Sequence, residues 1–404
     1  MTNQKVLGVF RQVRDLGLAG AALLLALVMA CQHSPKQEGL TYGGTGDDRG
    51  NAVQQTTDGG YIIAGTTNSF GAGGRDVYLV RTTAAGDTLW TRTYGGPNGD
   101  VGNAVQQTSD GGFIVAGTTS SFGAGDSDVY VIRTNAAGDT QWTRTFGGTL
   151  ADMGFSVERT LDGGYVIAGA TLSSSVGNHD VYLIKINDEG ATVWTRTCGG
   201  SNDDKGISVK QTRDSGFVIA GFTASFGAGN YDYYLVKTNP AGDTQWTRTF
   251  GGANSDQAYS VRQTSDRGYV VTGNANSYGA GNSDVYLVRT DAAGTLLWTR
   301  TCGGVGLDWS MSVEQTPDSG FIVAGASGSS GAGVLDVYLI KTKATGDTLW
   351  TRTYGGAEAD KGFSMQRTSD GGYVVVGLTS SYGVGGEDVY FVKIDSTGDA
   401  EFVR

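Results

Sequence analysis

The sequence has little histidine, cysteine or proline, and no excess of positive charge. Its 404 residues include 2 His, 3 Cys and 4 Pro, and the formal net charge is −11 at pH 7. Because His33 and His179 are the two histidines, no histidine cluster can form, and we expect no metal centre and no cofactor. The acidic charge disfavours binding to phosphate backbones, so we expect no nucleic-acid partner.

Sequence motifs of common active sites are also missing. A serine triad would have to use His179, whose surroundings contain no nucleophile elbow, and no glycine-rich phosphate loop precedes a helix. We therefore expect a non-catalytic binding or scaffold protein, without catalytic residues. A carbohydrate-active protein, glycoside hydrolase-like or lectin-like, remains an alternative, because the two carboxylates of such a hydrolase can come from separate loops without forming a motif. Acids outside the repeated pattern described below include Asp47, Asp203, Glu358 and Glu387.

An apolar segment at the N-terminus differs from the rest of the chain. Basic residues precede an uncharged run from Leu16 to Ala30, which is short for a membrane span and ends at Cys31. This pattern predicts a signal peptide over residues 1–30. Residues Leu27 to Cys31 resemble a bacterial lipobox, which implies cleavage before Cys31 and lipidation of that cysteine, a plain signal peptide being the alternative. Residues 31–40 would then be the lipidated cysteine and a polar tether.

The predicted leader and anchor together indicate a location. We expect a lipoprotein held in the membrane of the bacterial cell envelope through Cys31, at the outer membrane, and either periplasmic or exposed on the surface. The membrane is thus the first expected partner.

A repeat of constant length organises the remainder. Tryptophan recurs every 52 residues, at Trp90, Trp142, Trp194, Trp246, Trp298 and Trp350, with Phe402 at the seventh position. Each repeat has four short runs of β-branched and aromatic residues, bounded by Gly, Asp and Asn, with no helical period. Asp-Gly-Gly and Ala-Gly-Asp turns join these runs in pairs, which predicts two hairpins per repeat.

Seven equal four-stranded units predict an all-β, seven-bladed β-propeller over residues 41–404, since a solenoid would need atypical end units. The segment 401–404 matches the beginning of the fourth strand of a repeat, and residues 41–44 match its end. We therefore predict that the N- and C-terminal segments pair and close the ring, and that the protein is a monomer.

The repeat, as in Asp110 to Gly117, resembles that of the bacterial Asp-Gly-Gly-Tyr-Ile-Val-Ala-Gly propeller lipoproteins, over essentially all of the chain after the leader. Looser resemblances are to Asp-box hairpins and to quinoprotein-like propellers. These resemblances imply a propeller with a lipid anchor, and they carry no catalytic residue with them.

Polar residues that recur in every repeat are interpreted as structural. Asp48, Asp58 and Asp76 have equivalents in all seven units, as does Arg92, whereas a site used once needs residues that occur once. We expect these arginines to pair with Asp of neighbouring strands or units. Calcium binding by the loops 46–48 and 202–204 is an alternative to the interpretation of these loops as solvated turns. Cys198 and Cys302 replace a repeated aromatic residue and are expected to fill the core without a disulfide.

The candidate binding site lies where one repeat departs most from the pattern. Because strands alternate in direction, the long connectors share one face, and loops on rigid scaffolds often bind ligands. Repeat 6 carries Trp309, which is outside the tryptophan series. We predict a site for a protein or glycan partner at that face, with packing between blades as the alternative role of its apolar side chains. Its residues are Leu307, Trp309, Leu335, Tyr231, Tyr259 and Phe363.

Overall fold

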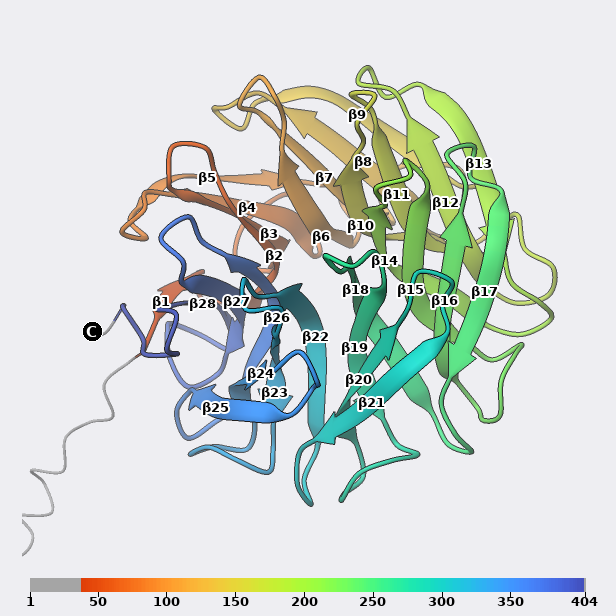
Figure 1. Cartoon of the computed structure of the whole chain (residues 1–404). Coiled ribbons are helices and arrows are strands. Elements are labelled where there is room, and N and C mark those ends of the chain that lie inside the picture. Colours follow the sequence, from red (N-terminus) through yellow and green to blue (C-terminus); the bar gives the residue numbers. More distant parts are fainter. Residues whose placement is uncertain (1–37, 403–404) are drawn as a thin grey trace, which may run out of the picture. The chain divides into compact units, whose positions relative to one another are not determined.

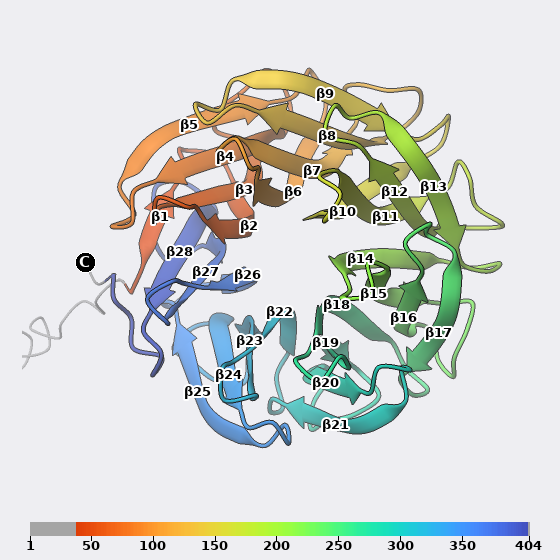
Figure 2. The same cartoon turned by 45° about the horizontal axis from the view of Figure 1, so that its top comes forward.

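Seven four-stranded antiparallel sheets form a closed ring around a central channel (Figure 1). The computed structural model describes residues 38–402 as one all-β unit, and the predicted signal peptide and Cys31 lie outside the described residues. Figure 2 shows the ring with the sheets arranged as blades around its axis. The predicted seven-bladed β-propeller is confirmed. Within residues 38–402 no helix is long and apolar enough to cross a membrane.

Each blade adds its strands from the channel outwards, and blade 1 begins with β2. The innermost strands are β2 (Asp48–Gln55), β6 (Asp100–Gln107), β10 (Asp152–Arg159), β14 (Asp204–Gln211), β18 (Asp256–Gln263), β22 (Asp308–Gln315) and β26 (Asp360–Arg367). The second strands are β3 (Tyr61–Thr67), β7 (Phe113–Thr119), β11 (Tyr165–Thr171), β15 (Phe217–Thr223), β19 (Tyr269–Ala275), β23 (Phe321–Ser327) and β27 (Tyr373–Thr379). The third strands are β4 (Asp76–Thr82), β8 (Asp128–Thr134), β12 (Asp180–Ile186), β16 (Asp232–Thr238), β20 (Asp284–Thr290), β24 (Asp336–Thr342) and β28 (Asp388–Ile394). The outermost strands are β5 (Thr88–Tyr94), β9 (Thr140–Phe146), β13 (Thr192–Cys198), β17 (Thr244–Phe250), β21 (Leu296–Cys302), β25 (Thr348–Tyr354) and, in blade 7, β1 (Leu40–Tyr42).

The hydrophobic core lies between neighbouring blades. In one such layer, Ile62 and Leu79 of blade 1 pack with Phe113 and Ile132 of blade 2. The middle strands β3 and β4 are buried at every position because a blade covers each of their faces, which explains their nearly continuous apolar sequence. The outer strand β5 has no such cover and is largely exposed.

The hairpin between the first and second strands is held by an ion pair. Asp58 accepts a hydrogen bond from Thr56 Oγ1 at 2.6 Å and pairs with Arg81 of the third strand at 2.5 Å. Arg81 is buried, and Gly59 of the turn has φ +86°, a conformation that glycine adopts without strain. We call the equivalent contacts of all blades the hairpin ion pairs: Asp58–Arg81, Asp110–Arg133, Asp162–Lys185, Asp214–Lys237, Asp266–Arg289, Asp318–Lys341 and Asp370–Lys393.

The two ends of the chain share the outermost strand of blade 7. Tyr42 of β1 lies opposite Val389 of β28, as Tyr94 lies opposite Val77 in blade 1. Near the C-terminus, Ala400 forms an antiparallel β-bridge with Ile394, at the opposite end of β28 from Val389. The predicted closure by pairing of the N- and C-terminal segments is confirmed, and it leaves no blade with a missing outer strand.

The repeated arginines of the outer strands stack on tryptophan. In each of six blades the guanidinium lies 5.3–5.6 Å from the ring centroid of the Trp two residues earlier. Pairing with Asp of the next blade, as expected from the sequence, occurs for Arg92, Arg196 and Arg300. Cys198 and Cys302 are free thiols that pack partly buried against the core clusters.

Candidate binding site at the mouth of the central channel

A β-bulge in every innermost strand directs one side chain towards the channel. In β2 the register with β3 shifts between Gly50 and Ala52, which leaves Asn51 as the extra residue. A bulge of this kind re-aims a side chain while the sheet continues. The same shift occurs in all seven blades. The residues at this position are Asn51, Asn103, Phe155, Ile207, Tyr259, Met311 and Phe363.

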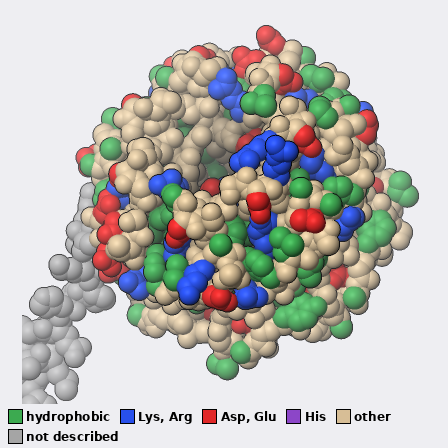
Figure 3. Space-filling model, in the orientation of Figure 1, with side chains coloured by type: hydrophobic (Ala, Val, Ile, Leu, Met, Phe, Trp, Pro, Cys, Tyr) green, Lys and Arg blue, Asp and Glu red, His purple; other side chains and the backbone are tan. Residues whose placement is uncertain are grey.

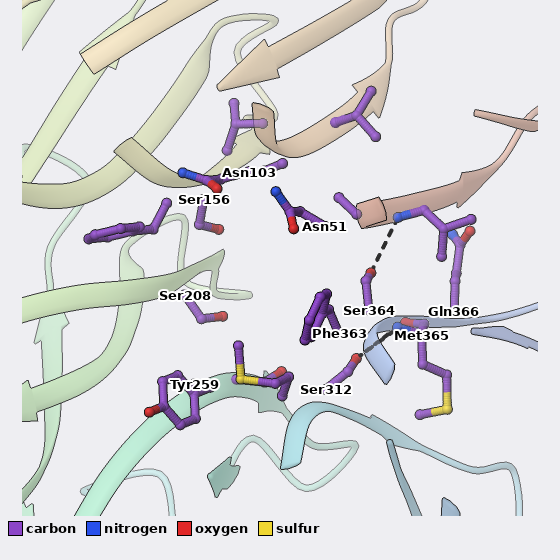
Figure 4. Close-up of a pocket in the computed structure, with 18 of the residues that line it drawn as sticks. Asn51, Asn103, Ser156, Ser208, Tyr259, Ser312, Phe363, Ser364, Met365 and Gln366 are labelled. Atoms are coloured by element: carbon purple, nitrogen blue, oxygen red, sulfur yellow. Dashed lines mark hydrogen bonds between the residues drawn. The ribbon is translucent and has the colours of Figure 1, made fainter. Parts of the chain in front are cut away.

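These bulge residues line a channel of about 470 Å³ that is polar on one side and apolar on the other. Figure 4 shows Asn51, Asn103, Tyr259 and Phe363 around the open space. The amides of Asn51 and Asn103 donate to the carbonyls of Gly102 and Gly154 in the following blade, at 2.9 and 2.7 Å. Burial raises the pKa of Tyr259 to about 12, so the phenol stays neutral and donates to Gln257 at 2.7 Å.

Charged side chains lie near the end of the channel that the short hairpins surround. Glu158 pairs with Lys210 at 2.6 Å, and Arg262 pairs with Glu314 at 2.7 Å, each pair joining neighbouring innermost strands. Figure 3 shows Lys and Arg side chains gathered beside the hollow at the centre of the face turned to the viewer.

A second cavity, of about 310 Å³, lies at the opposite mouth in blades 5 and 6. It is lined by Tyr259, Asn274, Ser283, Leu307, Trp309 and Met311. The Asn274 amide donates to Ser283 Oγ at 3.1 Å, so the apolar walls carry one polar pair. Leu307 is 51% exposed, which leaves apolar surface open to a ligand.

The structure brings together most of the predicted site residues. Tyr259, Leu307 and Trp309 share the second cavity, and Phe363 stacks on Trp309 with ring centroids 6.0 Å apart at 18°. Trp309 and Leu335 are both partly exposed, and Trp309 also packs on Phe363 of the next blade, so its side chain combines surface exposure with packing between blades. Leu335 forms a bridge with Ala359 in the next junction and is outside the cavity.

Tyr231 belongs to a separate polar group. Its ring packs edge-on against Phe222, and its hydroxyl donates to Asp203 at 3.4 Å. His179 Nδ1 lies 2.9 Å from the other oxygen of Asp203. Partial burial opposes ionisation of Asp203, yet the hydrogen bonds from His179 lower its pKa below the ordinary value.

The carboxylates outside the repeat pattern make contacts that do not favour acid catalysis. A general acid needs a raised pKa, and the pKa of Asp203 is lowered. Glu387 pairs with Arg49 at 2.5 Å, while Asp47 accepts from the backbone N–H of Glu387 and Glu358 is exposed. Within residues 38–402, no group of three or more His, Cys, Asp or Glu side chains is placed to hold a metal ion.

The sequence analysis named Tyr259 and Phe363 among the channel-lining bulge residues but missed the other five. The position of Asn51 and its equivalents at 52-residue intervals varies from blade to blade, as does the position of Arg49 two residues earlier. Variation inside a repeated strand therefore points to this segment, without singling out the bulge residue.

The fold is that of known β-propellers. Puromycin hydrolase shares 14% identity with a TM-score of 0.54, covering 91% of this chain and 55% of that one. Sqt1 of Chaetomium thermophilum, bound to the N-terminus of ribosomal protein L10, shares 12% identity with a TM-score of 0.51, covering 91% and 90%. The Pan2 WD40 domain of Neurospora crassa shares 11% identity with a TM-score of 0.51, covering 86% and 89%. These similarities show the fold alone.

Sequence comparison adds one distant relative. The regulatory protein FlaEY of Caulobacter vibrioides is 25% identical over 227 residues, which are 48% of this chain and 22% of that protein. The chain thus spans about a fifth of the relative it matches. No family model matches the sequence.

Proposed function

We propose that this protein is a non-catalytic binding propeller that takes an apolar side chain of a partner protein at the mouth of its channel. The observation that carries the proposal is the second cavity, where Tyr259, Leu307 and Trp309 meet beside the polar pair Asn274 and Ser283. Apolar walls with a few placed polar groups are typical of ligand sites. A propeller of this fold, Sqt1, is bound to the N-terminus of L10.

Replacing Trp309 by alanine tests this function. Peptides selected from a displayed random library on the full chain are expected to share an aromatic or aliphatic anchor residue. We expect Trp309→Ala to weaken their binding by about 2 kcal/mol, the usual effect of removing an aromatic anchor. Calorimetric titration measures the affinity, and thermal unfolding shows whether the variant is folded.

The matched control is Phe122→Ala, which removes an aromatic side chain 44% exposed in the connector before β8. Peptide affinity should not change in this variant. Equal affinity of wild type and Trp309→Ala would contradict the proposal. Glycan binding by the wild type on an array, lost in a folded Trp309→Ala variant, would replace the protein partner by a carbohydrate.

The proposal includes attachment to the cell envelope as a monomeric lipoprotein of the Asp-Gly-Gly-Tyr-Ile-Val-Ala-Gly propeller group. The residue pattern before Cys31 supports it. When the full-length chain is expressed in a bacterium with radiolabelled palmitate, we expect label in the wild type and in Cys198→Ser, and none in Cys31→Ser. Membrane-bound, labelled Cys31→Ser protein would show that the anchor is elsewhere.

A further inference from the structure

The two faces of the ring differ in charge. We call connector face the long connectors that lead into the third and the innermost strands, together with the first two residues of each of those strands. It holds 19 acidic and 4 basic side chains, a formal charge of −15. The rest of residues 38–402 holds 20 side chains of each sign and is neutral. The acidic character of the chain therefore comes from the face at which the second cavity lies.

Most of the acids of the connector face are a repeated feature of the fold. An aspartate begins every innermost strand and every third strand, at the junctions between blades. At most 3% of any of these residues is exposed. These junction aspartates are Asp48, Asp76, Asp100, Asp128, Asp152, Asp180, Asp204, Asp232, Asp256, Asp284, Asp308, Asp336, Asp360 and Asp388.

Burial and hydrogen bonds act in opposite directions on the charge of the junction aspartates. Burial raises the pKa of six of the seven aspartates that begin third strands. In an innermost strand, Asp308 Oδ2 accepts from Gly304 N at 2.8 Å and from Ser329 Oγ at 2.5 Å, and such bonds favour the ionised form. If every third-strand aspartate held a proton, the connector face would still carry a formal charge of −8.

Two junction aspartates adjoin residues that line the second cavity. Asp284 follows Ser283, and Asp308 lies between Leu307 and Trp309. Among the described residues, neither aspartate forms an ion pair. Charges of one sign behind low-dielectric walls concentrate their field at the opening of a cavity. A ligand in the second cavity is therefore exposed to a negative potential.

The four basic side chains of the connector face offset little of this charge at the cavity. Arg49 pairs with Glu387 at 2.5 Å. In blade 7, Lys361 is accompanied by the exposed Glu358, which lies in the connector leading into the same strand. The other two basic residues, Arg75 and Lys205, lie at the junctions between blades 1 and 2 and between blades 3 and 4.

We propose that the partner segment that binds at the second cavity is basic, with an apolar anchor flanked by Lys or Arg. This inference rests on the proposed function, because the anchor occupies the same cavity. Charge complementarity steers the encounter and excludes acidic partners, which the connector face repels. The aliphatic stems of flanking Lys or Arg side chains can pack on the exposed Leu307 while their charged ends stay in water.

Three synthetic peptides with blocked ends test the charge and the anchor separately: Lys-Lys-Trp-Lys-Lys, Glu-Glu-Trp-Glu-Glu and Lys-Lys-Ala-Lys-Lys. In calorimetric titrations of the full chain, we expect the first peptide to bind and the second to show no binding. The third should bind at least about tenfold more weakly than the first, since it lacks the aromatic anchor. Raising NaCl from about 0.05 to about 0.5 M should weaken the first about tenfold, because the Debye length falls from about 14 to about 4 Å.

A matched pair of variants tests whether the connector face is responsible for the charge effect. Glu358→Lys reverses an exposed acid at the junction next to the cavity, and Glu189→Lys makes the same change in the exposed turn between β12 and β13 on the opposite face. At low salt we expect Glu358→Lys to weaken the binding of Lys-Lys-Trp-Lys-Lys about three- to fivefold, the range for an exposed charge pair. Glu189→Lys should leave its affinity unchanged.

The outcomes separate this inference from the proposed function. Binding of Glu-Glu-Trp-Glu-Glu as tight as that of the lysine peptide, or lysine-peptide binding that neither salt nor Glu358→Lys weakens, would overturn the basic partner and leave the cavity. Equal affinity of the lysine peptide for Trp309→Ala and wild type, or equal affinity of the tryptophan and alanine peptides, would overturn the anchor cavity and leave the charge preference. No binding by any of the three peptides would overturn both.

Discussion

Replacing Phe391 by alanine is expected to lower the free energy of unfolding by about 3–5 kcal/mol, the usual cost of emptying a buried aromatic site. Phe391 is fully buried in β28, where the other blades have Leu or Val. Its ring packs edge-on against Tyr61 of blade 1 at 5.1 Å and stacks on Phe402 at 5.8 Å. The side chain thus joins the last blade, the first blade and the C-terminal segment, so its loss weakens the closure of the ring.

Urea denaturation of Phe391→Ala beside Phe122→Ala measures this effect. Phe122 is 44% exposed, so its truncation leaves little cavity and should cost about 1 kcal/mol or less. A Phe391→Ala variant as stable as Phe122→Ala would show that the contacts between the chain ends add little to the stability of the ring.

Acidification below pH 4 is expected to remove the contribution of the hairpin ion pairs to the stability of the fold. Hydrogen bonding from Thr108, together with Arg133, lowers the pKa of Asp110 to about 2. Thr316 and Lys341 lower the pKa of Asp318 to about 2, and Lys393 and Thr368 lower the pKa of Asp370 to about 2. The pKa values of the other four hairpin aspartates are also lowered.

The direction in which stability changes with pH follows from the linkage between protonation and folding. A carboxyl whose folded pKa lies below its unfolded value stabilises the fold above the unfolded pKa and loses that contribution as pH falls through the folded pKa. The hairpin aspartates lose their contribution to stability between about pH 4 and about pH 2, as set by the ordinary and the lowered pKa of aspartate. The aspartates at the blade junctions act in the opposite direction, because a raised pKa makes protonation favour the fold.

The unfolding free energy of Asp110→Asn, followed from pH 7 to pH 2, checks the acid effect. We expect a loss of about 1–2 kcal/mol at pH 7, kept small because half of the Asp110 side chain is exposed. The difference from wild type should shrink as pH falls towards 2, where the native carboxyl is about half protonated. Asp126→Asn, an exposed acid in the connector before β8, should match the wild type throughout. A difference for Asp110→Asn that is independent of pH would contradict the assignment.

The candidate site was predicted in part. Trp309 stood out because it breaks the tryptophan series, and Leu307 and Tyr259 do lie with it in one cavity. Leu335 and Tyr231 were grouped with them by their place in neighbouring connectors, and the structure places them outside that cavity. Proximity along a repeat does not decide which neighbour a side chain meets, because that depends on the rotation between blades.

The sequence by itself determined the strands, the number of blades and the closure of the ring. Apolar runs bounded by Gly and Asp specify strands locally, and the 52-residue period with its split last strand permits one closed arrangement. Only the tertiary structure decided that Asn51 and its equivalents point into the channel, and that Asp76 meets Asp100. The first depends on a bulge in the register with the next strand, and the second on contact between separate blades, so neither is a property of local sequence.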